Sequence, residues 1–270
     1  MHIGIVIRNM GEQSTREIMA GAALAAEERK FESIWVVDHI AIPPDDSEGS
    51  GGRYVDILTT LAWLAGVTSK INLGSGVLIA PFRSLLPSAK QIASIQEISG
   101  NRLLLGVGLG WMDAEFKALG VNRKDRGKIT DEFLTFMNKA FCQDEMELNG
   151  QKFLFKPRPP KPLLYIAGSK GYSIKRAVRY GDGWIPIARE PEELTESLEE
   201  YKKLSEASNK PSDRISVVSW INPKDKRSTQ KKLKGFEDMG IERIICGLQY
   251  DSLKDYLEQI DLLKSFSLAS

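Results

Sequence analysis

The sequence predicts an α/β fold, a TIM-type (β/α)8 barrel with a small hairpin insertion after the fourth barrel helix. Eight short apolar segments alternate with segments of helical periodicity, and 270 residues is about the length that such a barrel needs. An open doubly wound sheet would have fewer units or a nucleotide fingerprint at its first turn, and neither is present. Apolar and charged residues are spread evenly along the chain, so we expect a single domain over residues 1–270.

The strands are predicted from short apolar runs, which are typical of parallel strands buried on both faces. They cover residues 2–7, 33–37, 71–78, 103–108, 163–167, 184–187, 215–220 and 243–247. Apolar residues three or four positions apart predict the helix that follows each strand. In order, these helices are marked by Met19 and Ala22, Leu58 and Leu61, Ala89 and Ile92, Phe133 and Phe136, Ile174 and Ala177, Leu194 and Leu198, Leu233 and Phe236, and Leu257 and Ile260.

Capping and proline signals place the starts of three helices. A capping box runs from Ser14 to Glu17 and predicts that the first helix begins there. Pro87 falls in the first turn of the third helix, where a missing N–H is tolerated. Pro191 is placed at the start of the sixth helix for the same reason.

Two features interrupt the regular alternation. Asn149 and Gly150 lie between alternating residues and predict a two-residue hairpin over about residues 145–155. The loop from residue 109 to about 125 is long for a compact domain, and loops of that length are more often functional than idle.

Residues 99–111 (SGNRLLLGVGLGW) form the most distinctive stretch of the chain. An apolar run passes into Gly106, Gly108 and Gly110, which predicts a buried strand whose far end lets something large approach the backbone. The alternative is that these glycines ease packing at a crowded barrel centre. The spacing is not that of a dinucleotide fingerprint, since the third glycine of that pattern would fall at Trp111.

Composition points to small-molecule partners. The formal net charge is +1, so no basic surface for nucleic acid and no polybasic segment for a membrane is indicated. Cys142 and Cys246 are far apart in apolar contexts, which suggests reduced thiols. Residues 1–20 contain no signal-peptide pattern and no apolar run has membrane length, so we expect a cytoplasmic protein.

The candidate site residues follow from the fold, because the working residues of such barrels lie where strands end at the carboxyl-terminal face. The positions selected in this way include Asp38, His39, Gly76, Val77, Leu109, Gly110, Trp111, Gly168, Ser169, Lys170 and Trp184. His39 can hold or donate a proton near neutral pH, and Asp38 beside it can orient the ring. A purely structural histidine is the alternative. With two histidines and two separated cysteines, a zinc site of the usual ligand types is not expected.

A phosphate site is indicated at residues 168–171 (GSKG). This segment places backbone N–H groups, a hydroxyl and an ammonium at a predicted helix N-terminus, which favours an anion. A plain glycine loop is the alternative. Among the tryptophans, Trp35 and Trp63 are predicted to be core residues, whereas Trp111 and Trp184 follow glycines at predicted strand ends and are expected to line a pocket.

Taken together, these motifs resemble the bacterial luciferase-like superfamily of flavin and deazaflavin oxidoreductases, and within it the short deazaflavin-dependent (F420-dependent) branch. The resemblance covers roughly residues 2–187. The resemblance rests on residues 35–39 (WVVDH), 73–77 (LGSGV), 99–102 (SGNR) running into 106–111 (GVGLGW), Glu115 and Phe116 before Gly120, Arg126, and residues 177–184.

The resemblance implies a barrel that holds coenzyme F420, or alternatively FMN, at its carboxyl-terminal mouth. It implies a non-prolyl cis bulge at Gly76 and Val77 that supports the cofactor ring. It also implies that the backbone of Leu109 and Gly110 approaches the ring.

By the same resemblance, Asp38 and His39 approach the ring and the substrate, and Gly168, Ser169 and Lys170 bind the cofactor phosphate. Sugar-phosphate-oxidising members carry a glutamate acid where this chain has Trp111, so their substrate is not implied. Members of the family often pair through barrel helices, which makes a homodimer an expectation by resemblance.

The leading hypothesis is therefore an enzyme that transfers a hydride between a small organic substrate and a bound deazaflavin or flavin, with His39 moving the proton. An FMN-dependent monooxygenase on the same scaffold is one alternative, and a flavin-binding protein without turnover is another. An unrelated barrel that acts on a phosphorylated metabolite through residues 168–171 is a third.

Overall fold

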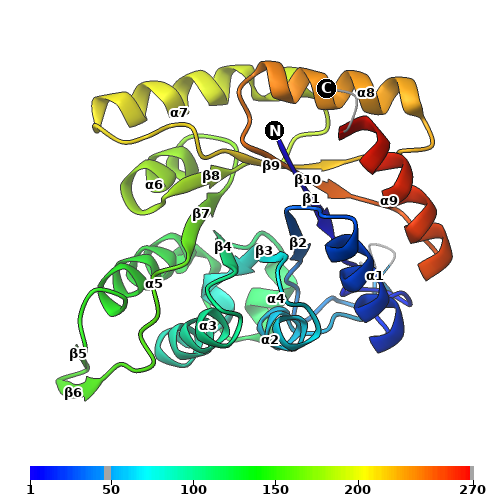
Figure 1. The fold of residues 1–270 in the computed structure, drawn as a ribbon. Coiled ribbons are helices and arrows are strands. Elements are labelled where there is room, and N and C mark those ends of the chain that lie inside the picture. The colour runs from blue at the N-terminus through cyan, green and yellow to red at the C-terminus, as the bar shows by residue number, and fades with distance from the viewer. Residues whose placement is uncertain (46–49, 268–270) are drawn as a thin grey trace.

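A computed structural model of the chain describes residues 1–45 and 50–267 (Figure 1). The strands are β1 (His2–Val6), β2 (Ser33–Val36), β3 (Asn72–Ile79), β4 (Leu103–Gly108), β5 (Glu145–Leu148), β6 (Gln151–Leu154), β7 (Leu163–Ala167), β8 (Gly183–Ile185), β9 (Ser216–Trp220) and β10 (Arg243–Gly247). The α-helices are α1 (Arg16–Glu28), α2 (Ile57–Val67), α3 (Leu85–Ile98), α4 (Asp113–Ala118), α5 (Arg126–Ala140), α6 (Tyr172–Tyr180), α7 (Thr195–Ala207), α8 (Lys226–Asp238) and α9 (Leu253–Ser267). Short 3-10 turns cover Ala80–Phe82, Arg123–Asp125 and Pro191–Leu194.

The eight barrel strands are all parallel and form a nearly closed TIM-like barrel, as predicted. Their order is β8-β7-β4-β3-β2-β1-β10-β9. The two ends of this sheet are joined at isolated bridges between Trp184 and Ile215 and between Ile187 and Val218. The Val218 N–H donates to the carbonyl of Pro186 at 2.9 Å across the same seam. β8 and the residues that follow it are therefore held beside β9.

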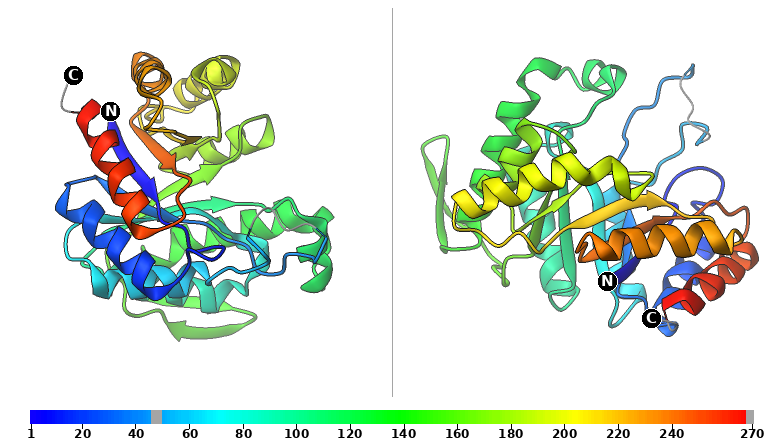
Figure 2. Two further views of the ribbon diagram at one scale, coloured as in Figure 1. Left: turned by 90° about the vertical axis from the view of Figure 1, so that its right-hand side faces the viewer. Right: turned by 90° about the horizontal axis from the view of Figure 1, so that it is seen from above.

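Apart from α4, the helices lie outside the strands, and the main apolar core fills the layer between them (Figure 2). The barrel interior holds a separate cluster in which Trp35 is the largest member and is fully buried. Gly4 and Gly74 make room for its indole, because a Cβ at either position would lie within 2.6 Å of the Trp35 ring. At the amino-terminal end of the barrel strands, Arg243 pairs with Glu32 at 2.7 Å and contacts the Tyr165 hydroxyl at 3.1 Å.

The predicted hairpin is present as β5 and β6 after α5, where Figure 1 shows it extending away from the barrel strands. Asn149 and Gly150 both have positive φ, of 52° and 76°, as the turn requires. The predicted cap of the first helix is wrong by one residue: Thr15 is the N-cap and accepts from the Ile18 N–H at 3.3 Å. Ser14 is instead buried and donates to the Gly11 carbonyl at 2.6 Å.

The long loop predicted over residues 109–125 contains a short helix, α4, that periodicity alone did not reveal. Six residues give too little sequence for a helical period. Its first turn carries Asp113 and Glu115, which suit the positive end of a helix dipole. Within the described residues, no helix combines the length and the apolar character that a membrane span requires.

Candidate active site

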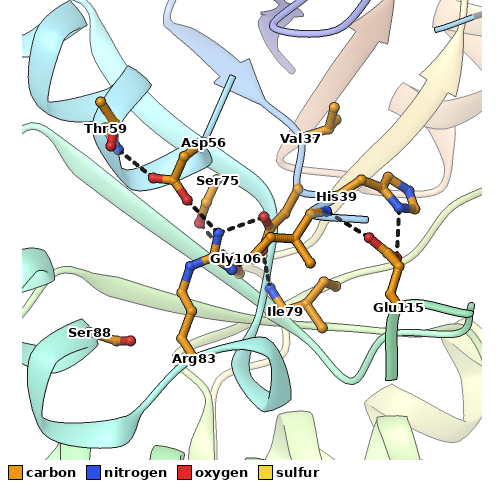
Figure 3. Close-up of polar contacts among 12 residues, drawn as sticks. Val37, His39, Asp56, Thr59, Ser75, Ile79, Arg83, Ser88, Gly106 and Glu115 are labelled. Carbon is orange, nitrogen blue, oxygen red and sulfur yellow. Dashed lines mark hydrogen bonds and ion pairs between the residues drawn. The ribbon is translucent and has the colours of Figure 1, made fainter. Parts of the chain in front are cut away.

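His39 lies where β2 ends, and its ring is held by a buried carboxylate (Figure 3). The Nδ1 atom of His39 is 2.9 Å from Oε2 of Glu115, whose side chain is only 1% exposed. The other oxygen, Oε1, accepts from the backbone N–H groups of Ile40 at 2.6 Å and Ala41 at 3.1 Å. All of these contacts use the carboxylate as an acceptor, so Nδ1 carries a hydrogen and the Nε2 atom is left for other partners.

Two aromatic rings border His39. The Tyr54 ring lies with its centroid 5.0 Å away, and the Trp111 ring meets the imidazole edge-on at 6.1 Å. Trp111 is 58% exposed although it is a large apolar residue. His39 is therefore flanked by two aromatic rings just beyond the end of β2, at the carboxyl-terminal side of the barrel.

Asp38 does not join His39, because successive residues of an extended chain point to opposite sides. Its carboxylate accepts two bonds from Arg83, at 2.6 and 2.8 Å, and one from the Ile79 N–H at 2.8 Å. Arg83 also binds Asp56 at 2.7 Å. Burial raises the pKa of Asp38 although Arg83 and Ile79 act in the opposite direction. The structure thus places Asp38 as a positioning residue that ties the end of β2 to the end of β3.

The peptide bond between Gly76 and Val77 is cis, and the pairing of β3 with β4 shifts register between Ser75 and Leu78. Gly106 and Gly108 of β4 face this bulge. A Cβ at Gly106 would lie 2.2 Å from the Ser75 carbonyl oxygen, and one at Gly108 would lie 2.6 Å from Val77. For these two glycines the packing interpretation therefore holds. The bulge keeps Val77 in contact with the barrel interior near the mouth.

Leu109 and Gly110 continue from the end of β4, and both are partly exposed. Gly110 has a φ of 76°, and a Cβ there would lie 2.9 Å from Ile79 and 3.1 Å from Phe116. A side chain is thus excluded both by the backbone conformation and by the neighbouring residues. The close packing fixes the path of the chain from β4 to Trp111.

Residues 168–170 lie between β7 and α6, as predicted, and they present a set of donors. Gly168 has a φ of 119°, the Ser169 hydroxyl is 3.5 Å from the Ile187 carbonyl, and Lys170 is exposed. No side chain caps the N-terminus of α6, and its first turn contains no acidic residue. Backbone N–H groups, a hydroxyl and an ammonium at an uncapped helix start fit a phosphate group.

Trp184 is not a pocket residue. It is fully buried, stacks on Tyr201 of α7 with centroids 5.1 Å apart, and therefore packs between the sheet and that helix. Its Nε1–H donates to the Gly168 carbonyl at 2.6 Å. The prediction failed because the short strand β8 turns this side chain outward. Trp184 supports the loop of residues 168–170 from behind.

In the sequence, Glu115 stands out only as part of a family motif, and no local pattern points to Tyr54 or Arg83. Their roles depend on contacts between residues that are distant in the chain, such as the 45 positions between Asp38 and Arg83. One available signal was an acidic residue beside Phe116 in the long loop after β4. In the described ranges, 1–45 and 50–267, no group of three or more histidine, cysteine or acidic side chains is placed to hold a metal ion.

A known protein family matches most of the chain. Residues 1–223 match the family described as luciferase-like monooxygenase. The chain belongs to that family. The hypothesis of an unrelated barrel acting on a phosphorylated metabolite is therefore wrong, and the chain is a luciferase-like family oxidoreductase.

Relatives of this luciferase-like protein include proteins with different cofactors. Uncharacterized protein Rv0940c of Mycobacterium tuberculosis is 28% identical over 246 residues, covering 84% of this chain and 83% of that protein. The F420-dependent hydroxymycolic acid dehydrogenase of the same species is 29% identical over 198 residues, covering 70% of this chain and 53% of the dehydrogenase. The FMNH(2)-dependent dimethylsulfone monooxygenase of Pseudomonas putida is 24% identical over 235 residues, covering 82% of this chain and 63% of that enzyme.

Solved structures share the fold of the luciferase-like protein along its whole length. The monooxygenase RslO1 from Streptomyces bottropensis superposes with a TM-score of 0.80 at 19% identity and covers 100% of this chain and 99% of its own. An F420-dependent secondary alcohol dehydrogenase, solved with an F420–acetone adduct, gives a TM-score of 0.80 at 16% identity, with 98% and 97% covered. At these identities the likeness concerns the fold alone.

Proposed function

We propose that this protein is an F420-dependent oxidoreductase that transfers a hydride to or from a small organic substrate at the carboxyl-terminal mouth of the barrel. The single observation that carries the proposal is the His39–Glu115 pair at 2.9 Å beside that mouth. The F420-dependent relative supports the choice of cofactor.

The residues present fit such a cofactor. The uncapped N-terminus of α6, together with Ser169 and Lys170, would hold its phosphate. The bulge at Gly76 and Val77 and the backbone of Leu109 would lie against its ring. A bound deazaflavin supplies the acceptor or donor carbon for hydride transfer, and the protein supplies orientation and electrostatics.

Proton transfer is the step of the reaction that this chain's own residues carry out. When an alcohol carbon gives up a hydride, its hydroxyl must lose a proton, and the Nε2 atom of His39 takes it. In the reverse direction the imidazolium returns the proton to the carbonyl oxygen. Glu115 keeps Nδ1 protonated and stabilises the positive ring, so Nε2 is the atom available for transfer.

Cofactor binding and turnover test this proposal. F420 and FMN are each titrated into the purified protein while their fluorescence or absorbance is followed, and turnover is then measured with a panel of alcohols and carbonyl compounds. We expect F420 to bind and His39→Ala to lower kcat by about 100-fold or more. Failure of both cofactors to bind would refute the proposal, and binding without any effect of His39→Ala on rate would favour a flavin-binding protein without turnover.

An FMN-dependent monooxygenase is the second candidate. The FMNH(2)-dependent relative favours it. It predicts that FMN binds more tightly than F420 and that turnover consumes oxygen. Oxygen uptake with reduced FMN, measured against the same protein with reduced F420, separates the two candidates.

A further inference from the structure

We propose that Arg8 is a specificity residue that binds an anionic group of the substrate, and that the substrate is an organic anion with an apolar body. The proposal rests on the proposed function only in taking the barrel mouth as the substrate site. Its evidence is the position of Arg8, the state of its guanidinium and the apolar residues around the same part of the mouth.

Arg8 lies just beyond the end of β1, on the strand beside that of His39. Strand alternation places it on the same side as Gly4 and Val6, which face the barrel interior at Trp35. The amide of Asn9, on the opposite side, binds both the N–H and the carbonyl of Val37 at 3.0 and 2.8 Å. This clamp fixes the end of β1 against the end of β2, so Arg8 and His39 share one side of the mouth.

The guanidinium of Arg8 is held by Tyr250 and pairs with no carboxylate among residues 1–45 and 50–267. Its Nη1 donates to the Tyr250 carbonyl at 3.1 Å, and its backbone N–H donates to the Tyr250 hydroxyl at 2.9 Å. The Nε atom is buried and has no hydrogen-bond partner within the part of the chain that the structure describes. Burial raises the pKa of Tyr250 to about 12, so its hydroxyl is not a counter-ion. Across residues 1–45 and 50–267 no carboxylate pairs with Arg8, which leaves a fixed positive charge with spare donors.

The cofactor phosphate is not the anion that Arg8 is placed to bind. In the sheet, β7, β4, β3, β2 and β1 follow one another, so β1 is four steps from β7 in an eight-stranded barrel. The loop of residues 168–170, which follows β7, therefore lies across the mouth from Arg8. A group bound by Arg8 lies instead near His39, where the proton is moved.

Large apolar residues lie around the same mouth, and they indicate that the rest of the ligand is apolar. Ile40, Trp111, Ile187 and Trp220 follow or end four different barrel strands and are each 47–58% exposed. Trp220, at the end of β9, leans over Gly247 of β10, since a Cβ at Gly247 would lie 3.3 Å from the indole. That direction is toward β1 and Arg8. An apolar ring or chain with one acidic group satisfies both features.

A matched pair of probes tests the proposal: 3-phenylpropanoate and its uncharged amide, 3-phenylpropanamide. Their affinities are measured by titration calorimetry on the full chain, with and without F420. We expect the acid to bind at least about 10-fold more tightly than the amide. Arg8→Gln should weaken the acid by about 10- to 100-fold and leave the amide within about 3-fold. Arg8→Lys should retain part of the preference, and Arg179→Gln, on the opposite face, should change neither affinity.

Three results would overturn the proposal: no measurable binding of the acid, equal binding of acid and amide to the wild type, or an unchanged preference in Arg8→Gln. A large loss of F420 affinity in Arg8→Gln, with the acid unaffected, would assign the guanidinium to the cofactor and would also overturn it. If the wild type binds neither F420 nor FMN but still prefers the acid through Arg8, the proposed function fails and the anion site stands. Arg8→Lys keeps the test valid if Arg8→Gln does not fold.

Discussion

The Nδ1 atom of His39 lies 2.9 Å from a carboxylate oxygen of Glu115, a residue 76 positions further along the chain. Glu115 is almost completely buried, and its second oxygen receives the backbone N–H groups of Ile40 and Ala41. One carboxylate thus fixes both the histidine ring and the chain that follows it. This arrangement makes the tautomer of His39 a measurable property of the site.

Glu115→Gln tests that arrangement directly. An amide has one acceptor oxygen, so it cannot accept from both His39 and the Ile40 backbone. If the oxygen stays with the backbone, the amide N–H₂ faces Nδ1 and the hydrogen of the neutral ring moves to Nε2. We expect the nitrogen NMR signals of His39 to change from the Nδ1–H to the Nε2–H pattern and kcat to fall by about 10- to 100-fold.

The matched control for this variant is Asp113→Asn, an exposed acid in the same short helix that pairs with Arg123. It should leave the His39 signals and kcat unchanged. Assignment is simple, because His2 is the one other histidine in the sequence. An unchanged His39 spectrum in Glu115→Gln would mean that the carboxylate does not set the tautomer.

Gly106→Ala should destabilise the protein because the new Cβ would lie 2.2 Å from the Ser75 carbonyl oxygen, which is backbone and cannot turn away. We expect a loss of at least about 2 kcal/mol in the free energy of unfolding, measured with urea. Gly66→Ala is the control: this helical glycine has no neighbour within 4 Å of a new Cβ. It should gain roughly 0.5 to 1 kcal/mol. Equal effects of the two changes would contradict the packing role given to Gly106.

Glu27→Gln should lower stability in a pH-dependent way. The carboxylate of Glu27 accepts from the backbone N–H groups of Ser69, Lys70 and Ile71 at 2.9, 2.6 and 2.9 Å. Burial alone would raise its pKa, but these donors outweigh burial and the pKa is lowered from its ordinary value of 4.5. The folded state therefore gains stability above about pH 4.5 and loses it as the pH falls through the lowered pKa.

We expect Glu27→Gln to lose about 1 kcal/mol at neutral pH and less at pH 3, because the stability contributed by the charged carboxylate decreases as the pH falls below its ordinary pKa of 4.5. Urea unfolding at both pH values measures the difference. Glu28→Gln, an exposed neighbour on the same helix, should change stability little at either pH. A loss that is the same at both pH values would show that charge is not the cause.

Trp184→Phe distinguishes two roles of this side chain, which are its hydrogen bond to the loop of residues 168–170 and its packing in the core. Phenylalanine keeps the aromatic contact with Tyr201 but loses the hydrogen bond to the Gly168 carbonyl. We expect a loss of about 1 kcal/mol in stability and a several-fold weaker affinity for F420, since the loop is less well fixed. Trp63→Phe, in a helix on the outer side of the barrel, should leave the cofactor affinity unchanged. Equal affinities for the two variants would argue against a phosphate site at this loop.

Much of the fold was predictable from local patterns. Each barrel strand is a short apolar run, and each barrel helix repeats its apolar residues every three or four positions. Asn149 and Gly150 are residue types that readily adopt the positive φ of a two-residue hairpin turn. The errors arose where a local pattern had two solutions. Ser14 and Thr15 can both cap a helix, but the Ser14 hydroxyl already donates to the Gly11 carbonyl at 2.6 Å and accepts from Arg53 at 2.8 Å, which leaves Thr15 as the cap. The helix α4 was too short to show a period.

The sequence by itself determined the barrel, its family and the strand ends at which a site could form, because these depend on periodicity and on short motifs. Only the tertiary structure decided which side chains meet: Glu115 with His39, Arg83 with Asp38, and Trp184 with Gly168. These contacts join positions 16 to 76 residues apart. A linear pattern does not encode them, since they arise only when closure of the sheet brings the strand ends together.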